Sequence, residues 1–168
     1  MKIREAVEAD RAAVWTMLEP VFRAGDTYAI DADIPREAAL DYWFGPERHV
    51  FVTEDAGEVL GTYYIVRNQK GGGSHVCNCG YVTAPAAQGR GVARAMLAHS
   101  LDIAPDLGFR AMQYNFVVST NTRAIETWQR AGFEVVGRLP GAFLHPDQGY
   151  VDALVMYREL GGAAENPG

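Results

Sequence analysis

The stretch QGRGVA at residues 88–93 follows an expected strand and precedes an expected helix, and it is the strongest local signal in the sequence. Its two glycines allow the backbone to turn tightly and a ligand to approach it closely. The helix that follows presents unpaired backbone N–H groups and the positive end of its dipole, which suits an anion such as a pyrophosphate. Arg90 or Arg94 can add charge-assisted hydrogen bonds to phosphate oxygens. The stretch matches neither the Walker nor the Rossmann pattern, so taken alone it also fits a simple strand-to-helix connection.

Hydrophobic periodicity and turn signals on both sides of this stretch predict an alternation of strands and helices. The expected strands lie at residues 3–6, 49–55, 58–66, 75–83, 109–118, 133–138 and 150–157. The expected helices begin after a cap at Asp10, at Pro35, at Val92 and at Asn121, the last one closed by Gly132. Residues 25–35 and the Pro- and Gly-rich segment between the last two strands are expected to be loops. The strand–helix–strand units of the second half favour an α/β fold with a mixed sheet covered by helices.

Length and charge limit the classes of protein that this chain can belong to. Its 168 residues fit one domain, expected over residues 1–160 and followed by a disordered tail at residues 161–168. The net charge of −6 argues against nucleic acid or an anionic membrane as the main partner, since both require a basic surface. No apolar run reaches the roughly 20 residues of a membrane-spanning helix, and the charged N-terminus has no apolar signal core, so we expect a cytoplasmic protein. Cys77 and Cys79 are expected to be reduced and buried, because two cysteines two apart on a strand are poorly placed to bridge.

A second motif, NTRAIETWQRAGF at residues 121–133, lies downstream of the glycine turn. In order and spacing the two motifs resemble those of the GNAT superfamily of N-acetyltransferases, and the resemblance covers residues 3–160. The family's Gln/Arg-x-x-Gly-x-Gly/Ala signature is matched by Gln88, Gly91 and Ala93. Its Asn-x-x-Ala…Tyr…Gly-Phe helix is matched except that Trp128 stands where many members have a tyrosine that protonates the leaving thiolate. An indole N–H is not a useful acid, so either another group donates the proton or the thiolate, with a thiol pKa of about 8.5, leaves unaided.

This resemblance implies a GNAT fold, with a mixed central sheet of about six to seven strands, about four flanking helices and splayed strands at 75–83 and 109–118. It implies acetyl-CoA as cosubstrate, with the pantetheine arm lying in the gap as an added strand would. A backbone N–H near residues 80–82 would polarise the thioester carbonyl, and the bound amine would attack directly without a covalent enzyme intermediate. The residues that the resemblance implies in cofactor binding are Val82, Thr83, Ala84, Gln88, Gly89, Arg90, Gly91, Val92, Ala93, Arg94 and Asn121.

Three asparagines, Asn78, Asn115 and Asn121, are candidates for functional roles. The first two stand at strand positions that asparagine disfavours, and the third stands at the start of a helix. Asparagine is depleted in strands and costly when buried without partners, yet Asn78 and Asn115 lie in the middle of expected strands. Pleat alternation allows the two side chains to line one cleft. With Asn121 they resemble three functional asparagines of a GNAT subgroup that acetylates proline analogues such as L-azetidine-2-carboxylate. That resemblance implies that Asn78 and Asn115 orient and bind the acceptor as catalytic residues, and that Asn121 lies near the CoA sulfur. The alternatives are an N-cap role for Asn121 and a structural bridge between strands for the other two.

The remaining candidates are weaker. Tyr28 lies in the 25–35 loop and is a candidate for covering the acceptor, as that region does in family members, although it also fits a surface turn. His75, Cys77 and Cys79 share a strand face but cannot readily converge on one ion, so no metal is expected. Several groups are candidates for the general base that deprotonates the amine, and the sequence does not choose among Glu5, Asp41, Glu54, His75 and the C-terminal region.

Three functions remain open at this point. The first is acetyl transfer from acetyl-CoA to a small-molecule amine or imino acid, with detoxification of proline analogues as one form of it. The second is acetylation of a peptide N-terminus or lysine, which requires an open acceptor groove that the 25–35 loop is able to cover. The third is a non-catalytic acyl-CoA-binding module, which the tryptophan at position 128 leaves open. No nucleic acid and no membrane partner is expected. Homodimers are common in the superfamily that the chain resembles, so the resemblance implies a possible homodimer.

Overall fold

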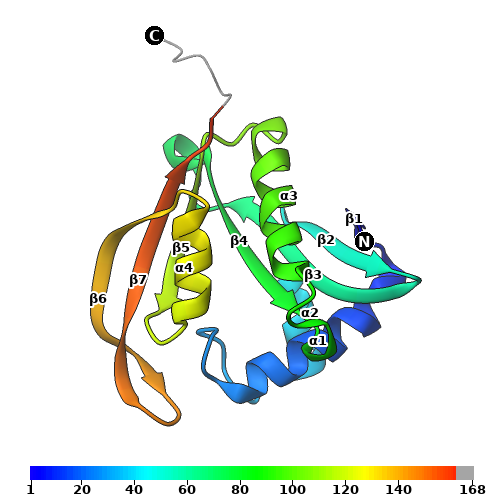
Figure 1. Cartoon of the computed structure of the whole chain (residues 1–168), viewed down its shortest axis with the longest axis horizontal. Coiled ribbons are helices and arrows are strands. Elements are labelled where there is room, and N and C mark those ends of the chain that lie inside the picture. Colours follow the sequence, from blue (N-terminus) through cyan, green and yellow to red (C-terminus); the bar gives the residue numbers. More distant parts are fainter. Residues whose placement is uncertain (162–168) are drawn as a thin grey trace.

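The computed structural model describes residues 1–161 and shows a mixed sheet with helices on both faces (Figure 1). Within these residues the sheet has seven strands in the order β1-β2-β3-β4-β5-β7-β6. The strands are β1 (Lys2–Glu5), β2 (His49–Asp55), β3 (Glu58–Arg67), β4 (Val76–Thr83), β5 (Ala111–Val118), β6 (Glu134–His145) and β7 (Gly149–Glu159). The helices are α1 (Arg11–Ala24), α2 (Arg36–Trp43), α3 (Val92–Asp106) and α4 (Thr122–Arg130). The predicted α/β class is confirmed, and residues 162–168 of the predicted tail lie outside the described residues.

Each face of the sheet has its own hydrophobic core. One core lies under α3 and α4 and contains Met96, Met112 and Tyr114. The other lies under α1 and α2 and contains Leu18 and Trp43. Strand alternation sends the free, buried thiols of β4 into the first core, as expected for reduced cysteines. No helix among residues 1–161 is long and apolar enough to cross a membrane.

The two central strands separate soon after they meet. The parallel strands β4 and β5 pair only through Val76 with Ala111 and Cys77 with Met112. Further along, the pairing of β5 with β7 shifts register between Tyr114 and Val117. Such an irregularity bends a strand, and Figure 1 shows β4 and β5 diverging from their paired ends. The predicted splaying of the central strands is therefore confirmed.

The last two strands differ from the prediction. The Pro- and Gly-rich segment expected to be a loop belongs to a long β6–β7 hairpin instead. Strand β6 is at the sheet edge, where a proline such as Pro140 need not break a ladder hydrogen bond. A register shift between Leu139 and Phe143 accommodates the irregular residues. Asp152 on β7 supports them by accepting hydrogen bonds from the Gly141 N–H (2.9 Å) and from Arg138 (2.6 Å).

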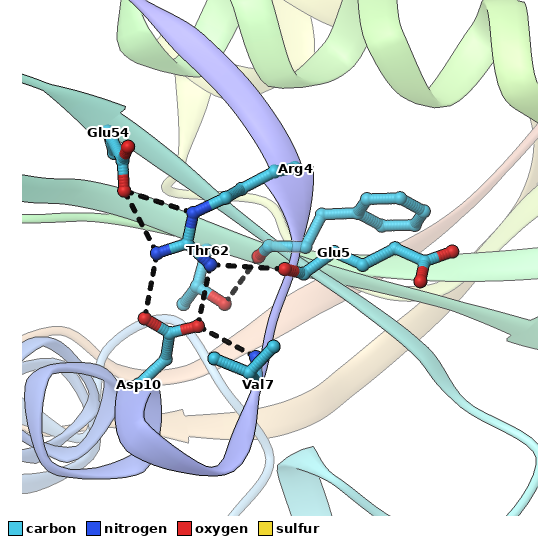
Figure 2. A network of polar contacts seen from close by, with 7 residues as sticks. Arg4, Glu5, Val7, Asp10, Glu54 and Thr62 are labelled. Carbon is cyan, nitrogen blue, oxygen red and sulfur yellow. Dashed lines mark hydrogen bonds and ion pairs between the residues drawn. The ribbon is translucent and has the colours of Figure 1, made fainter.

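Asp10 stands at the predicted N-cap position of α1, but its side chain does not cap the helix. A 3-10 turn, Glu8–Asp10, precedes the helix, and the Asp10 side chain makes no capping hydrogen bond to it. Its carboxylate instead accepts from the Val7 N–H (2.7 Å) and from Nη1 and Nη2 of Arg4 (2.8 and 3.0 Å), as Figure 2 shows. Arg4 also donates from Nε to Glu54 of β2 at 3.0 Å. The pair with Arg4 occupies the Asp10 carboxylate in place of a cap hydrogen bond, and Arg4, which also binds Glu54, fastens the start of α1 to the β1–β2 edge.

The Asp10–Arg4 pair gives a testable pH dependence of stability. Asp10 is only 6% exposed, and the hydrogen bonds from Arg4 hold its pKa below the ordinary value. Removing the carboxylate by Asp10→Asn leaves Arg4 short of a partner, so we expect the free energy of unfolding at neutral pH to fall by about 2 kcal/mol. Because the folded-state pKa lies below the unfolded value of about 4, this contribution is full above that value and is lost as the pH falls through the folded pKa.

The measurement is urea unfolding of the wild type and Asp10→Asn at about pH 7 and about pH 3, where the difference between them should shrink. Glu8→Gln is the matched control, because Glu8 belongs to the same turn and its side chain is 91% exposed. A difference in stability that stays constant across the pH range would contradict the role assigned to Asp10.

Candidate active site

The glycine turn between β4 and α3 has the backbone that its sequence predicts. Gly89 and Gly91 both have φ of +81°, a left-handed conformation that other residues adopt only at a cost. Gly91 is the N-cap of α3, and its carbonyl accepts the Ala95 N–H at 3.0 Å. The N–H groups of the first helical turn, at Val92, Ala93 and Arg94, have no partner within the helix. The turn therefore presents unpaired donors at the positive end of a helix of 15 residues.

The side chains around this turn leave it open to a ligand. Gln88, Gly89, Arg90, Ala93 and Arg94 are all exposed, whereas Val92 is buried in the core. Arg90 forms an ion pair with Asp55 of the β2–β3 turn at 3.2 Å. Both side chains are largely exposed, so a phosphate can compete for the guanidinium.

Backbone groups of β4 point into the gap where the central strands part. The hydrogen bonds from Asn68 N–H to Val76 O (2.7 Å) and from Ala84 N–H to Leu60 O (2.8 Å) show that even-numbered residues of β4 pair with β3. The odd-numbered residues face the other way, and beyond Cys77 they have no strand partner. The N–H groups of Tyr81 and Thr83 therefore face the gap.

The alternation of even- and odd-numbered residues along β4 narrows the set of residues expected to hold the pantetheine arm. Thr83 is well placed for it, and Val82 pairs with Thr62 of β3 and contributes a buried side chain. Ala84 is not free for a backbone contact, because its N–H binds Leu60 and its carbonyl accepts the Ala87 N–H at 2.9 Å. Tyr81 was missed as a named contact, since only the pairing with β3 shows which residues face the gap.

Asn78 and Asn115 lie on the face of the sheet that α1 and α2 cover. Both line a cavity of about 460 Å³ near the end of α2. Asn115 donates to Asn68 Oδ1 at 2.6 Å and accepts from Gln113 Nε2 at 2.9 Å, so part of its amide bridges β5 to the end of β3. No side-chain hydrogen bond of Asn78 is found within residues 1–161, which leaves its amide available. Asn68 and Gln113 were not expected at this site, because only the folded sheet brings them to Asn115.

Asn121 occupies the N-cap position of α4 without a capping side chain. Its backbone φ and ψ are −81° and 59°, its carbonyl accepts the Ile125 N–H, and its side chain makes no cap hydrogen bond. The amide is half-buried at the end of the splayed β5. Asn121 therefore occupies the N-cap position through its backbone alone, and its side chain is not used for capping.

Trp128 of α4 packs against a buried tyrosine pair rather than standing alone. Its ring lies 4.5 Å from that of Tyr114, and the Tyr114 hydroxyl lies 3.0 Å from the Tyr81 hydroxyl. Tyr81 also contacts the hydroxyl of Ser100 at 2.8 Å. Burial raises the pKa of both tyrosines well above the ordinary value, so both stay protonated at neutral pH.

Tyr28 reaches from the loop after α1 to β4. Its hydroxyl donates to the Tyr81 carbonyl at 2.9 Å, and its ring packs edge-on against Phe22 and Trp43. The Tyr81 carbonyl belongs to the set of β4 groups that face the gap. The loop is therefore tied to the place where the strands part, which is more than a surface turn requires.

The other candidates lie elsewhere or have other partners. His75 is exposed just before β4, and Glu54 is engaged by Arg4. Asp41 lines the 460 Å³ cavity, whereas Glu5 lines a different cavity of about 230 Å³. Among residues 1–161 no group of three or more His, Cys, Asp or Glu side chains is placed to hold a metal ion.

Comparison with known proteins establishes the family. Residues 12–133 match the model of the acetyltransferase (GNAT) family. The N-acetyltransferase aca1 of Schizosaccharomyces pombe is 30% identical over 148 residues, covering 78% of this chain and 71% of the relative. A GCN5-related N-acetyltransferase from Kribbella flavida is 42% identical with a TM-score of 0.90, covering 95% of this chain and 97% of that chain. The structure of yncA from Salmonella typhimurium with its cofactor acetyl-CoA shares the fold at 23% identity, with a TM-score of 0.85 over 99% of this chain and 97% of that chain. This chain therefore belongs to the GNAT family and is an acetyl-CoA-dependent N-acetyltransferase.

Proposed function

We propose that this acetyltransferase acts on the amine of a small molecule, and that its acceptor is an amino or imino acid such as L-azetidine-2-carboxylate. The observation that carries the proposal is the convergence of Asn78 and Asn115, from the two strands that part, on one cavity of about 460 Å³. A cavity of that size suits a small molecule. A side-chain amide both donates and accepts hydrogen bonds, so it can contact either end of an amino acid.

The residues around the gap have distinct tasks in this proposal. The glycine turn and the first turn of α3 hold the diphosphate of acetyl-CoA, and Thr83 holds the pantetheine arm. The Tyr81 N–H donates to the thioester carbonyl oxygen, where negative charge develops. The acceptor nitrogen forms a bond to the carbonyl carbon, the carbon–sulfur bond breaks, and the nitrogen gives up one proton. Asn121, at the end of β5, lies near the departing sulfur.

The reaction needs a base that takes a proton from the amine, but it does not need a dedicated acid that protonates the CoA thiolate. Of the four residues named as candidate bases, Asp41 is the one that lines this cavity, so we assign it the amine proton, directly or through water. Trp128 supplies no acidic proton, and the thiolate of CoA leaves unaided because a thiol pKa of about 8.5 makes it a stable leaving group.

A small acceptor is favoured over a peptide by the segment that carries Tyr28. Its hydroxyl ties the loop to the Tyr81 carbonyl, where the strands part, and a loop held there leaves less room for an extended peptide than for a small molecule. Acetylation of peptides is therefore the second candidate. A homodimer and a cytoplasmic location stay predictions.

The glycine turn can be tested by a substitution that affects only backbone geometry. An alanine at position 91 would be forced to adopt the left-handed conformation at a cost of about 1–2 kcal/mol. We expect Gly91→Ala to shift the first N–H groups of α3 and to weaken CoA binding about tenfold or more, as measured by calorimetry. Gly108→Ala is the matched control, since Gly108 has φ of +93° at the opposite end of α3 and open space around it. Equal CoA affinity in the two variants would argue against the turn as the phosphate site.

The asparagines can be tested by separating acceptor binding from cofactor binding. We expect each of the variants Asn78→Ala and Asn115→Ala to raise the acceptor KM or lower kcat. In each variant kcat/KM should fall by about tenfold, because the substitution removes a hydrogen bond to the substrate. The affinity for acetyl-CoA should not change. The assay is release of free CoA thiol with azetidine-2-carboxylate, cis-4-hydroxyproline, polyamines, antibiotics and short peptides as acceptors. Gln148→Ala removes an exposed amide from the β6–β7 turn and serves as control. Loss of acetyl-CoA affinity in the asparagine variants would count against their role at the acceptor.

A further inference from the structure

Arg48 places an unneutralised positive charge in the wall of the cavity that Asn78 and Asn115 line. It lies between α2 and β2, and its side chain is half-buried. The Nη1 atom is buried and has no hydrogen-bond partner within residues 1–161. A guanidinium does not lose its proton in proteins, so the charge persists. A buried donor without a partner is costly, so a small movement of this lining side chain that lets a ligand in the cavity accept its hydrogen bond would remove that cost.

Two tyrosines hold the guanidinium in place. Its Cζ atom lies 4.3 Å from the ring centroid of Tyr42 and 3.9 Å from that of Tyr64. The two rings stand nearly perpendicular, at 80°, and their hydroxyls are 3.4 Å apart. Tyr64 is fixed in turn by Gly80 of β4, where an added Cβ would lie 2.8 Å from its Cζ atom. The charge is thus preorganised by contacts that leave its hydrogen-bonding capacity unused.

The other charges near the cavity are already engaged or lie at its rim. Arg67 forms a two-pronged pair with Glu47, at 2.6 and 3.0 Å. The Asp41 side chain is 78% exposed and lies 3.8 Å from Arg11. Among the ion pairs of residues 1–161 none includes Arg48. Glu5 borders the second cavity, which Arg48 also borders, without forming such a pair. The free charge in the acceptor cavity is therefore positive.

We propose that Arg48 binds the carboxylate of the acceptor, so that the substrate class is amines that carry a carboxylate. This inference rests on the proposed function and adds to it the group by which the acceptor is selected. Arginine presents parallel N–H donors that match the two oxygens of a carboxylate. With the carboxylate held at Arg48, the amides of Asn78 and Asn115 orient the rest of the acceptor. A purely cationic amine would meet repulsion from Arg48 instead.

The first test needs no variant, only pairs of acceptors that differ in the carboxylate. Azetidine-2-carboxylate is compared with azetidine-2-carboxamide, and proline with prolinamide, in the thiol-release assay. Binding of each compound to the protein saturated with CoA is measured by calorimetry as well. We expect the acids to exceed the amides by about 10- to 100-fold in kcat/KM or affinity, the range for one charge-assisted contact.

Variants then ask whether Arg48 produces this preference. Arg48→Met should reduce kcat/KM for the acids by the same factor while changing the amides little, so that the preference disappears. Arg48→Lys keeps the charge but not the planar fork, and it should retain part of the preference, which guards against a variant that fails to fold. Arg130→Met removes one exposed positive charge from α4 and controls for net charge. Affinity for CoA and the melting temperature are recorded for all three variants.

The outcomes separate this inference from the proposed function. Acids that bind through Arg48 but are never acetylated would support Arg48 as a carboxylate site and overturn the proposed acceptor. Turnover of amines with no preference for the acid, or a preference that survives in Arg48→Met, would overturn the role of Arg48 and leave small-molecule acetylation standing. Absence of binding or turnover for every carboxylate tested would also overturn it.

Discussion

The parting of β4 and β5 is the constraint on which the rest of the site depends. Two paired residues on each strand hold the strands together, and beyond them the odd-numbered N–H groups of β4 have no neighbouring strand. Backbone donors in a protein interior need partners, so an extended chain of amides entering the gap completes an interrupted sheet. The same strand then leads through Thr83 into the glycine turn, which places the proposed phosphate site in line with the gap. Strand geometry thus aligns the two parts of acetyl-CoA that the chain must hold.

The acceptor side is built from a different set of forces, chiefly aromatic packing on the α1–α2 face. Trp43 donates from Nε1 to Thr62 at 3.1 Å, and its ring lies 4.9 Å from that of Tyr64. Tyr64 in turn supports Arg48, so a hydrophobic core continues without interruption into a charged cavity wall. Rigid support of this kind matters because a small acceptor offers few contacts, and each must be made at the right distance. The side chains proposed to select the acceptor thus have positions fixed by the core.

Several sequence-based expectations meet hydrogen bonds or strand pairings that the local sequence pattern does not show. Asp10 has the residue type of a helix cap, but Arg4 and Val7 use its oxygens. The segment around Pro140 has loop composition, but an edge strand tolerates a missing N–H and a register shift. Ala84 follows the gap-facing residues directly, yet both of its backbone groups are already hydrogen-bonded. The capping preference of Asp10 is worth about 1 kcal/mol, which its hydrogen bonds to Arg4 and Val7 can exceed.

The sequence alone was sufficient for the α/β class, the order of the elements and the glycine turn, and it allowed Asn78 and Asn115 to share one face. These features follow from short-range rules: hydrophobic periodicity, the left-handed conformation of glycine, and the alternation of side chains along a strand. Only the tertiary structure decided which β4 backbone groups face the gap, which asparagine is tied to Asn68, and that Arg48 Nη1 has no hydrogen-bond partner among residues 1–161. Pairing and burial depend on residues distant in the chain. Glu47 directly precedes Arg48, and the local sequence does not show that its carboxylate pairs with Arg67 instead.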